Sequence, residues 1–236
     1  MEIQELWPGG PRFRQAEHFR LGTDSVLLAD FTQLRGAERG IDLGCGAGIL
    51  ALLLAEKSSA LHMTGLELQP GAAAVARENA ALNGLDGRLE VLEGDIRQHR
   101  ALFRAGSFDL AVSNPPYFPE GAGAAAPRAD RAAARGEASC SLAELCDAAA
   151  FLLRTGGSFF LVHRPERLSE LCACLSGRGL EPKRLRLVCH RAESAPSLVL
   201  LEARRGGHPG LTIEPMLVLS TPDGSESVEY RRIYHR

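Results

Sequence analysis

From Gly36 onward the chain alternates between short apolar segments and longer helical segments, and this alternation constrains the fold more than any other feature. We expect strands over residues 41–43, 61–66, 89–92, 108–113 and 158–162. Helices are expected between them, over residues 49–56, 71–82, 141–153 and 165–175. We expect two more strands, over residues 185–189 and 198–203, which would form an antiparallel pair. The pattern predicts a doubly wound, mostly parallel, seven-stranded α/β sheet with helices on both faces.

Length, composition and charge indicate a single globular domain. The chain has 236 residues, of which 45% are hydrophobic, enough for one core. We expect a single domain over 1–236, with an N-terminal arm and first helix over 1–35 and a substrate loop over 117–138. No apolar run reaches the length of a membrane span, and the acidic N-terminus lacks a signal peptide's apolar core, so we expect a cytoplasmic protein. The net charge of −2 disfavours a globally basic nucleic-acid binder but permits local basic patches.

A glycine-rich turn follows the first strand of the alternating series. Gly44, Gly46 and Gly48 come directly after Asp42 and precede a helix, so the backbone can approach a ligand closely there. A dinucleotide fingerprint would need glycine at position 49, where this chain has Ile49, which disfavours a nicotinamide cofactor. S-adenosylmethionine carries no pyrophosphate, so such a turn need only seat its methionine tail and ribose.

Two acids follow the next two expected strands. Glu67 ends the second strand, where its carboxylate could accept both ribose hydroxyls. Asp95 follows the third strand, where it could face the adenine amine. Because the carboxyl ends of parallel strands meet at one edge of a sheet, Asp42, Glu67 and Asp95 are expected to line one cleft that binds S-adenosylmethionine.

Asn114, Pro115, Pro116 and Tyr117 follow the fourth strand and predict the chemistry. The amide oxygen of Asn114 and the carbonyl of Pro115 could accept the hydrogens of a planar amine, so that its lone pair points at a methyl sulfonium. The prolines stiffen the turn and keep Asn114 extended. Tyr117 offers a flat face on which a base can stack. We therefore assign Asn114, Pro115 and Tyr117 catalytic roles, and Pro116 and Tyr117 contacts with the substrate.

A metal site is not expected, because the six cysteines lack the paired spacing of a zinc site. Arginines are the candidate contacts to a nucleic acid. Arg128, Arg131 and Arg135 lie in a Gly/Ala/Arg-rich segment directly after Tyr117, beside the expected base pocket, and we expect this segment to be mobile in the free protein. Further candidates lie in the N-terminal arm, on one expected strand face and at the C-terminus: Arg12, Arg14, Arg184, Arg186, Arg231, Arg232 and Arg236.

The two motifs together resemble class I S-adenosylmethionine-dependent methyltransferases of the N6-adenine and N5-glutamine type. Residues 19–28, FRLGTDSVLL, narrow the resemblance to the bacterial valine-tRNA adenine-N6-methyltransferase family. The similarity covers nearly the whole chain. It implies that the substrate is the adenosine 3′ of the anticodon in a tRNA, valine tRNA by the family's specificity. It also implies that Thr23 and Asp24 lie beside the methionine end of the cofactor, together with Asn114.

Other functions stay open at this point. Methylation of ribosomal RNA is an alternative that the sequence excludes only weakly. A protein glutamine N5-methyltransferase usually carries a separate N-terminal helical domain, for which the segment before Asp42 is too short. A DNA methyltransferase would need a recognition domain that the sequence does not indicate, so no DNA partner is expected. Outside enzymes, the alternative is a catalytically silent RNA-binding module on the same fold. The oligomeric state is not indicated.

Overall fold

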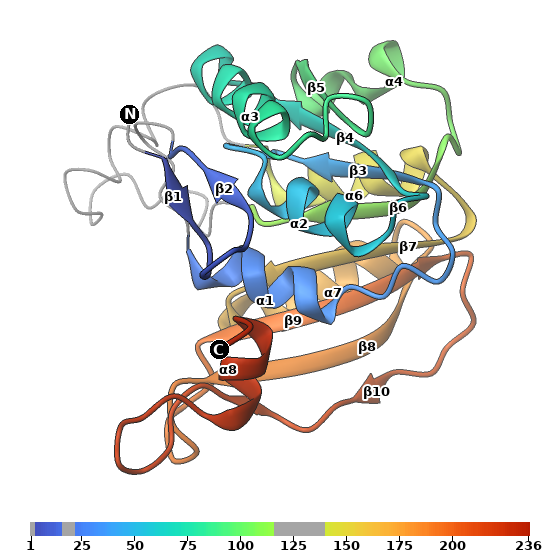
Figure 1. The fold of residues 1–236 in the computed structure, drawn as a ribbon. Coiled ribbons are helices and arrows are strands. Elements are labelled where there is room, and N and C mark those ends of the chain that lie inside the picture. The colour runs from blue at the N-terminus through green and yellow to red at the C-terminus, as the bar shows by residue number, and fades with distance from the viewer. Residues whose placement is uncertain (1–2, 16–21, 116–139) are drawn as a thin grey trace, which may run out of the picture.

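A mixed sheet runs through the molecule and is flanked by helices (Figure 1). The structure is a computed structural model and describes residues 3–15, 22–115 and 140–236. Seven of its strands lie in the order β8 (Leu180–Cys189), β9 (Leu198–Arg205), β7 (Leu153–His163), β6 (Phe108–Ser113), β3 (Arg39–Leu43), β4 (His62–Glu67) and β5 (Leu89–Glu93). Only β9 is antiparallel to its neighbours among these strands. This order confirms the predicted doubly wound, mostly parallel sheet. Two short strands, β10 (Thr212–Ile213) and β11 (Leu217–Val218), were not predicted and extend the sheet in parallel with β8.

Helices cover both faces of the sheet because successive side chains of a strand point to opposite sides. On β7, Phe160 and Val162 pack into one core with α1 (Thr23–Phe31), α2 (Ile49–Lys57), α3 (Pro70–Leu82) and α8 (Val228–Ile233). Phe159 and Leu161 pack into a second core on the other face with α6 (Leu142–Leu152) and α7 (Leu168–Ser176). The remaining short helices among the described residues are η1 (Ile96–Gln98), α4 (His99–Leu102) and η2 (Pro165–Arg167).

Most predicted elements are present, and the differences lie at their ends. The predicted helix 165–175 is divided into a 3₁₀ turn, η2, and then α7, which begins at Leu168. Strand β7 begins at Leu153, five residues before the predicted start, with a register irregularity against β6 between Phe108 and Leu110. The first helix, expected within residues 1–35, is α1, which ends at Phe31. These are shifts of boundary that leave the topology unchanged.

Two local structures depend on residues only a few positions apart in the sequence. Ser141 and Glu144 form the capping box of α6: the Glu144 backbone N–H donates to Ser141 Oγ, and the Ser141 backbone N–H donates to Glu144 Oε2 at 2.8 Å. The N-terminal arm is a hairpin of β1 (Gln4–Glu5) and β2 (Arg12–Phe13). In Figure 1 it lies beside α3.

Strand β3 is the point at which the order of the sheet reverses. From β3 the chain proceeds outward to β4 and β5, and it then returns to place β6 on the other side of β3. The crevice at the carboxyl ends of such a pair is where doubly wound folds bind their ligands. The glycine turn follows β3 and Asn114 follows β6, so both motifs meet at this crevice.

Candidate active site

The glycine turn joins β3 to α2 at the carboxyl edge of the sheet. Gly44, Gly46 and Gly48 have φ angles of +76°, +54° and +79°, which side-chain-bearing residues rarely adopt. The backbone N–H groups of Gly44 and Cys45 both donate to the Leu66 carbonyl, at 2.9 and 3.1 Å. The turn is therefore tied to the end of β4 and has a backbone that only glycine forms without strain.

Two acids lie beside this turn, at the ends of neighbouring strands. Asp42 is 1% exposed, and burial is the largest cause that raises its pKa to about 8. Its Oδ2 atom has no hydrogen-bond partner among the described residues. Glu67 is also buried, and its carboxylate accepts the backbone N–H groups of Gly46 at 2.8 Å and Gln69 at 2.9 Å. Glu67 therefore holds the turn in shape, a role that its position in the sequence did not indicate.

Asp95 follows β5 and begins η1, as its sequence position predicted, but its carboxylate has a partner. It accepts hydrogen bonds from the Arg97 backbone N–H at 2.9 Å and from Nε and Nη2 of the Arg97 guanidinium at 2.9 and 2.5 Å. These hydrogen bonds lower the pKa of Asp95. The next residue, Ile96, was not predicted to belong to the site: its Cδ1 would lie 3.8 Å from a Cβ placed on Gly44, so its side chain flanks the turn.

Asn114 leaves β6 beside the N-terminus of α1. Its Nδ2 donates to Ser25 Oγ at 3.0 Å, a contact that the sequence did not indicate. Just before it, the buried Ser113 hydroxyl donates to the Leu43 carbonyl at 2.7 Å and joins the ends of β6 and β3. Thr23, predicted to lie beside the cofactor, hydrogen-bonds with Tyr234 near the C-terminus. The segment after the arm thus reaches both the Asn114 motif and the end of the chain.

These residues fit S-adenosylmethionine on their own chemistry. The turn offers close backbone approach, and the buried, unpartnered Asp42 oxygen suits the ammonium of a methionine tail. No group of histidine, cysteine, aspartate and glutamate side chains within the described ranges could hold a metal ion. Pro115 also lies in the described part of the chain, whereas Pro116, Tyr117, Arg128, Arg131 and Arg135 lie outside it, and their predicted roles remain predictions.

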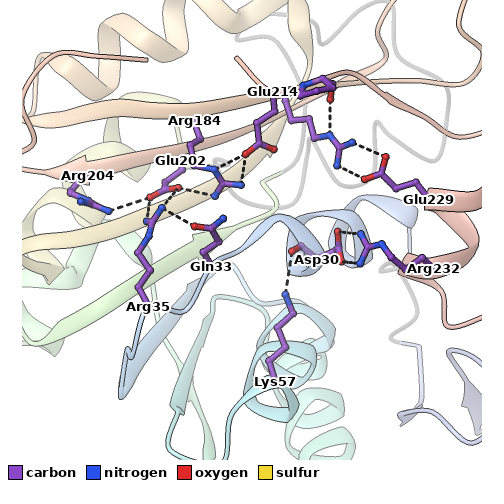
Figure 2. Close-up of polar contacts among 12 residues, drawn as sticks. Asp30, Gln33, Arg35, Lys57, Arg184, Glu202, Arg204, Glu214, Glu229 and Arg232 are labelled. Carbon is purple, nitrogen blue, oxygen red and sulfur yellow. Dashed lines mark hydrogen bonds and ion pairs between the residues drawn. The ribbon is translucent and has the colours of Figure 1, made fainter. Parts of the chain in front are cut away.

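Arg184 and Arg186, considered as a face for RNA, are committed to ion pairs within the protein. Figure 2 shows Arg184 between Glu202 and Glu214; its guanidinium lies 2.9 and 2.7 Å from their carboxylates. Arg186 forms two hydrogen bonds with Glu229, each 2.8 Å long. Both arginine side chains are about one-seventh exposed or less, at 14% and 13%. This pairing disfavours them as RNA contacts.

The network in Figure 2 fixes α1 to the strands behind it. Glu202 is fully buried and also pairs with Arg35, which follows α1. Burial alone would raise the pKa of Glu202, but the hydrogen bonds from Arg35 and Arg184 outweigh it and lower that pKa. Asp30 on α1 pairs with Arg232 on α8 at 2.9 Å. The helix that carries Ser25 is therefore held in place by charge pairs as well as by packing.

The remaining candidate arginines also have partners, with one exception. Arg14 pairs with Glu78 at 2.8 Å, Arg12 donates to the Leu82 carbonyl, and Arg236 pairs with Glu226. Arg231 is exposed and forms no ion pair with any described residue. In the described part of the chain, no helix has the length and apolar character needed to cross a membrane.

The comparisons with known proteins agree on one family. Residues 17–170 match the model of the methyltransferase small domain. The tRNA1(Val) (adenine(37)-N6)-methyltransferase of Tolumonas auensis is 36% identical, over 89% of this chain and 86% of its own. The enzyme of the same name from Aeromonas salmonicida is 33% identical, over 92% of this chain and 89% of its own.

Solved structures support the fold. A predicted O-methyltransferase of Agrobacterium tumefaciens superposes with a TM-score of 0.71 at 21% identity, over 90% of this chain and 95% of its own. A T. thermophilus 16S rRNA N2 G1207 methyltransferase, solved with AdoMet and guanosine, gives a TM-score of 0.60 at 22% identity, over 86% of this chain and 50% of its own. These two likenesses show the fold of this chain, a Rossmann-like class I methyltransferase fold.

Proposed function

This chain belongs to the methyltransferase small domain family and to the tRNA1(Val) (adenine(37)-N6)-methyltransferase family, and on that premise we propose how its site works. The enzyme uses S-adenosylmethionine to methylate the exocyclic N6 amine of an adenosine in tRNA, adenosine 37, on the 3′ side of the anticodon. We further propose that the particular substrate is a valine tRNA and that the reaction takes place in the cytoplasm. Both parts of the proposal rest on the activity of the relatives.

We assign cofactor binding to the glycine turn and its acids. Asp42, with its unpartnered buried oxygen, would face the methionine ammonium, and the turn at Gly44, Gly46 and Gly48 would seat the tail. Glu67 would accept the ribose hydroxyls while it continues to hold the Gly46 N–H, since a carboxylate has about four lone-pair sites. When bound, S-adenosylmethionine supplies an electrophilic methyl group on a sulfonium and leaves as S-adenosylhomocysteine.

The observation that carries the reaction is the position of Asn114 at the carboxyl end of β6, next to the turn that ends β3. In the proposal its amide oxygen and the Pro115 carbonyl accept the two hydrogens of N6. That arrangement makes the nitrogen more tetrahedral and points its lone pair at the methyl group. The Asn114 amide nitrogen donates to Ser25 Oγ, a contact that helps to orient the Asn114 side chain at the end of β6. The proton leaves to water after transfer, so the site needs orientation more than a base.

The test is methyl transfer by wild type and Asn114→Ala to a valine tRNA transcript, a ribosomal RNA fragment and a release-factor glutamine peptide. We expect N6-methyladenosine at the anticodon-adjacent position of the tRNA alone, read by nucleoside mass spectrometry. Asn114→Ala should lose ~10²-fold or more in turnover, because one preorganised acceptor of the transition state is gone. Its affinity for S-adenosylhomocysteine, measured by calorimetry, should stay near that of wild type. A variant with more than about a tenth of wild-type turnover would exclude this role for Asn114.

The RNA contacts form a separate part of the proposal. We assign phosphate contacts to Arg128, Arg131 and Arg135, which lie outside the described residues, on the argument that they follow Tyr117 in the chain. Neutralising all three should weaken tRNA binding and reduce the salt slope by roughly one unit per lost contact. Arg231→Gln is the matched single-charge comparison on the described surface. An unchanged affinity and slope in the triple variant would move the RNA surface elsewhere.

A further inference from the structure

Two asparagines, Asn79 in α3 and Asn83 at its C-terminal end, form hydrogen bonds with the backbone of the N-terminal arm in the pattern of a neighbouring β-strand. The Arg12 backbone N–H donates to Asn83 Oδ1 at 2.9 Å, and Asn83 Nδ2 donates to the Arg12 carbonyl at 2.7 Å. The Arg14 backbone N–H donates to Asn79 Oδ1 at 2.7 Å, and Asn79 Nδ2 donates to the Arg14 carbonyl at 3.0 Å. Side-chain amides have the donor and acceptor of a peptide group, so each asparagine replaces one residue of a strand ladder.

The spacing explains why the two elements match. Residues four apart on a helix are separated by about 6 Å along its axis. Residues two apart on a strand are separated by about 6.6 Å and present their backbone groups to the same side. Asn79 and Asn83 therefore meet Arg12 and Arg14 with little distortion of either element. The buried side chains of Leu6 and Phe13 add apolar contacts that attach the hairpin to the same core.

Asn79 differs from Asn83 in one contact. Its Nδ2 also donates to the Ala47 carbonyl, at 2.9 Å, and Ala47 stands between Gly46 and Gly48 in the cofactor turn. The Asn79 side chain is fully buried, and both its amide nitrogen and its amide oxygen are hydrogen-bonded. One side chain thus contacts the arm and the turn at once, whereas Asn83 contacts only the arm and its own helix.

We propose that Asn79 is a positioning residue that couples docking of the N-terminal arm, residues 3–15, to cofactor binding at the glycine turn. With the arm docked, Arg14 fixes the Asn79 amide, the amide fixes the Ala47 carbonyl, and the turn keeps the shape that receives the cofactor. Because such coupling is reciprocal, bound cofactor stabilises the docked arm. The inference rests on the cofactor seat proposed above.

The arm contains a tryptophan whose fluorescence can show whether the arm is docked. Trp7 is the only tryptophan of the chain, and its ring lies 4.4 Å from the ring of His235, centre to centre. Its indole also packs against Gly10, where an added Cβ would lie 2.3 Å from the ring nitrogen. Undocking of the arm should therefore change Trp7 emission, and that change can be followed with and without cofactor.

The experiment compares full-length wild type, Asn79→Ala and Asn83→Ala by calorimetry with S-adenosylhomocysteine and by Trp7 fluorescence. Both variants should loosen the arm. Asn79→Ala should raise the cofactor Kd about tenfold, within the usual range of coupling between sites. Asn83→Ala should raise it only a few-fold, because its contact with the turn is indirect. Added cofactor should restore docked-arm emission in Asn83→Ala but not in Asn79→Ala, a difference that a merely structural role would not produce.

Equal effects of the two variants on Kd, or an unchanged Kd in Asn79→Ala, would overturn the coupling. If Asn79→Ala does not fold, Asn83→Ala decides alone: a loosened arm with unchanged cofactor affinity contradicts the proposal. Wild type that binds no S-adenosylhomocysteine would instead contradict the proposed cofactor seat. The two failures are therefore distinguishable.

Discussion

Replacing Asp42 with asparagine should stabilise the free protein at neutral pH and weaken cofactor binding. Asp42 lies almost wholly buried, and burial raises its pKa from 3.8 to about 8, with Glu67 adding to the rise and the Ala51 backbone N–H opposing it. Between about pH 4 and pH 8 the folded chain therefore holds a proton that the unfolded chain has lost. The free energy of unfolding should fall by about 1.4 kcal/mol for each pH unit across that window.

The proton on buried Asp42 makes a large contribution to the stability of the folded chain at low pH. The interval from 3.8 to about 8 corresponds to on the order of 6 kcal/mol of stability, fully present below about pH 4 and lost as pH rises through about 8. A side-chain amide cannot ionise, so Asp42→Asn should lack this pH slope and should exceed wild type in stability most clearly at pH 8. Urea unfolding at several pH values measures the slope.

Cofactor binding should reverse the preference of Asp42 for its proton. A positive methionine ammonium beside the carboxyl group favours the charged form, so wild type should release most of one proton on binding at pH 7. Calorimetry in buffers of different ionisation enthalpy measures that release. Asp42→Asn should release none from this position and bind S-adenosylmethionine at least tenfold more weakly, on the order of 1.4 kcal/mol.

Asp109→Asn is the matched control for the pH experiment. Asp109 pairs with Arg154, and although burial opposes it, that hydrogen bond helps to lower the pKa of Asp109. Its removal should reduce stability above pH 4 and have little effect below its lowered pKa, the opposite sign to Asp42. If Asp42→Asn keeps the wild-type pH slope, or releases as many protons as wild type, then Asp42 is not a buried acid that ionises for the cofactor.

Three further outcomes follow from the contacts. Ser25→Ala should lower kcat about tenfold with little change in cofactor Kd, because Asn114 loses a partner that orients its amide. Ser25→Thr keeps a hydroxyl and should restore kcat; an equal loss of kcat in the two variants would exclude this role for Ser25. Glu202→Ala should lower the free energy of unfolding by about 1.5–3 kcal/mol in urea, because Arg35 loses its buried carboxylate partner and Arg184 keeps only Glu214; a loss under about 1 kcal/mol would show both guanidinium groups to be solvated. Gly48→Ala should reduce stability by at least about 1–2 kcal/mol and weaken cofactor binding, since φ is +79° and the new Cβ would lie 3.0 Å from Ala76 Cβ. A thermal melt and cofactor titration that match wild type would contradict this assignment.

Signals that act over a few residues could be read from the sequence. The capping box at Ser141 and Glu144, the glycine turn after Asp42 and the apolar runs of the strands all depend on local backbone geometry. The order of these signals was enough to predict the sheet and, through the resemblance, the activity of the family. The site residues that the sequence proposed remain proposals, although the structure brings the ends of β3, β4 and β6 together.

Partners distant in the chain could not be read in the same way. Ser25 and Asn114 are separated by 89 residues, and Asn79 and Arg14 by 65. The local sequence does not distinguish a helical asparagine that is solvated from one that forms hydrogen bonds with the backbone of a distant segment. Arg184 and Arg186 illustrate the converse: alternation correctly placed them on one strand face, but that face is covered by Glu202, Glu214 and Glu229 instead of being open to RNA.

Local patterns in the sequence were therefore enough to predict the succession of strands and helices and the glycine turn at Gly44, Gly46 and Gly48. These follow from sterics and hydrogen bonds within one element. The partners of the polar groups depend instead on how the elements pack: Asn79 joins the arm and the turn, Ser25 joins Asn114, and Glu202 pairs with three arginines. The reason is that a buried polar group must find a partner, and which groups lie within about 3 Å of it depends on how the sheet and its helices pack.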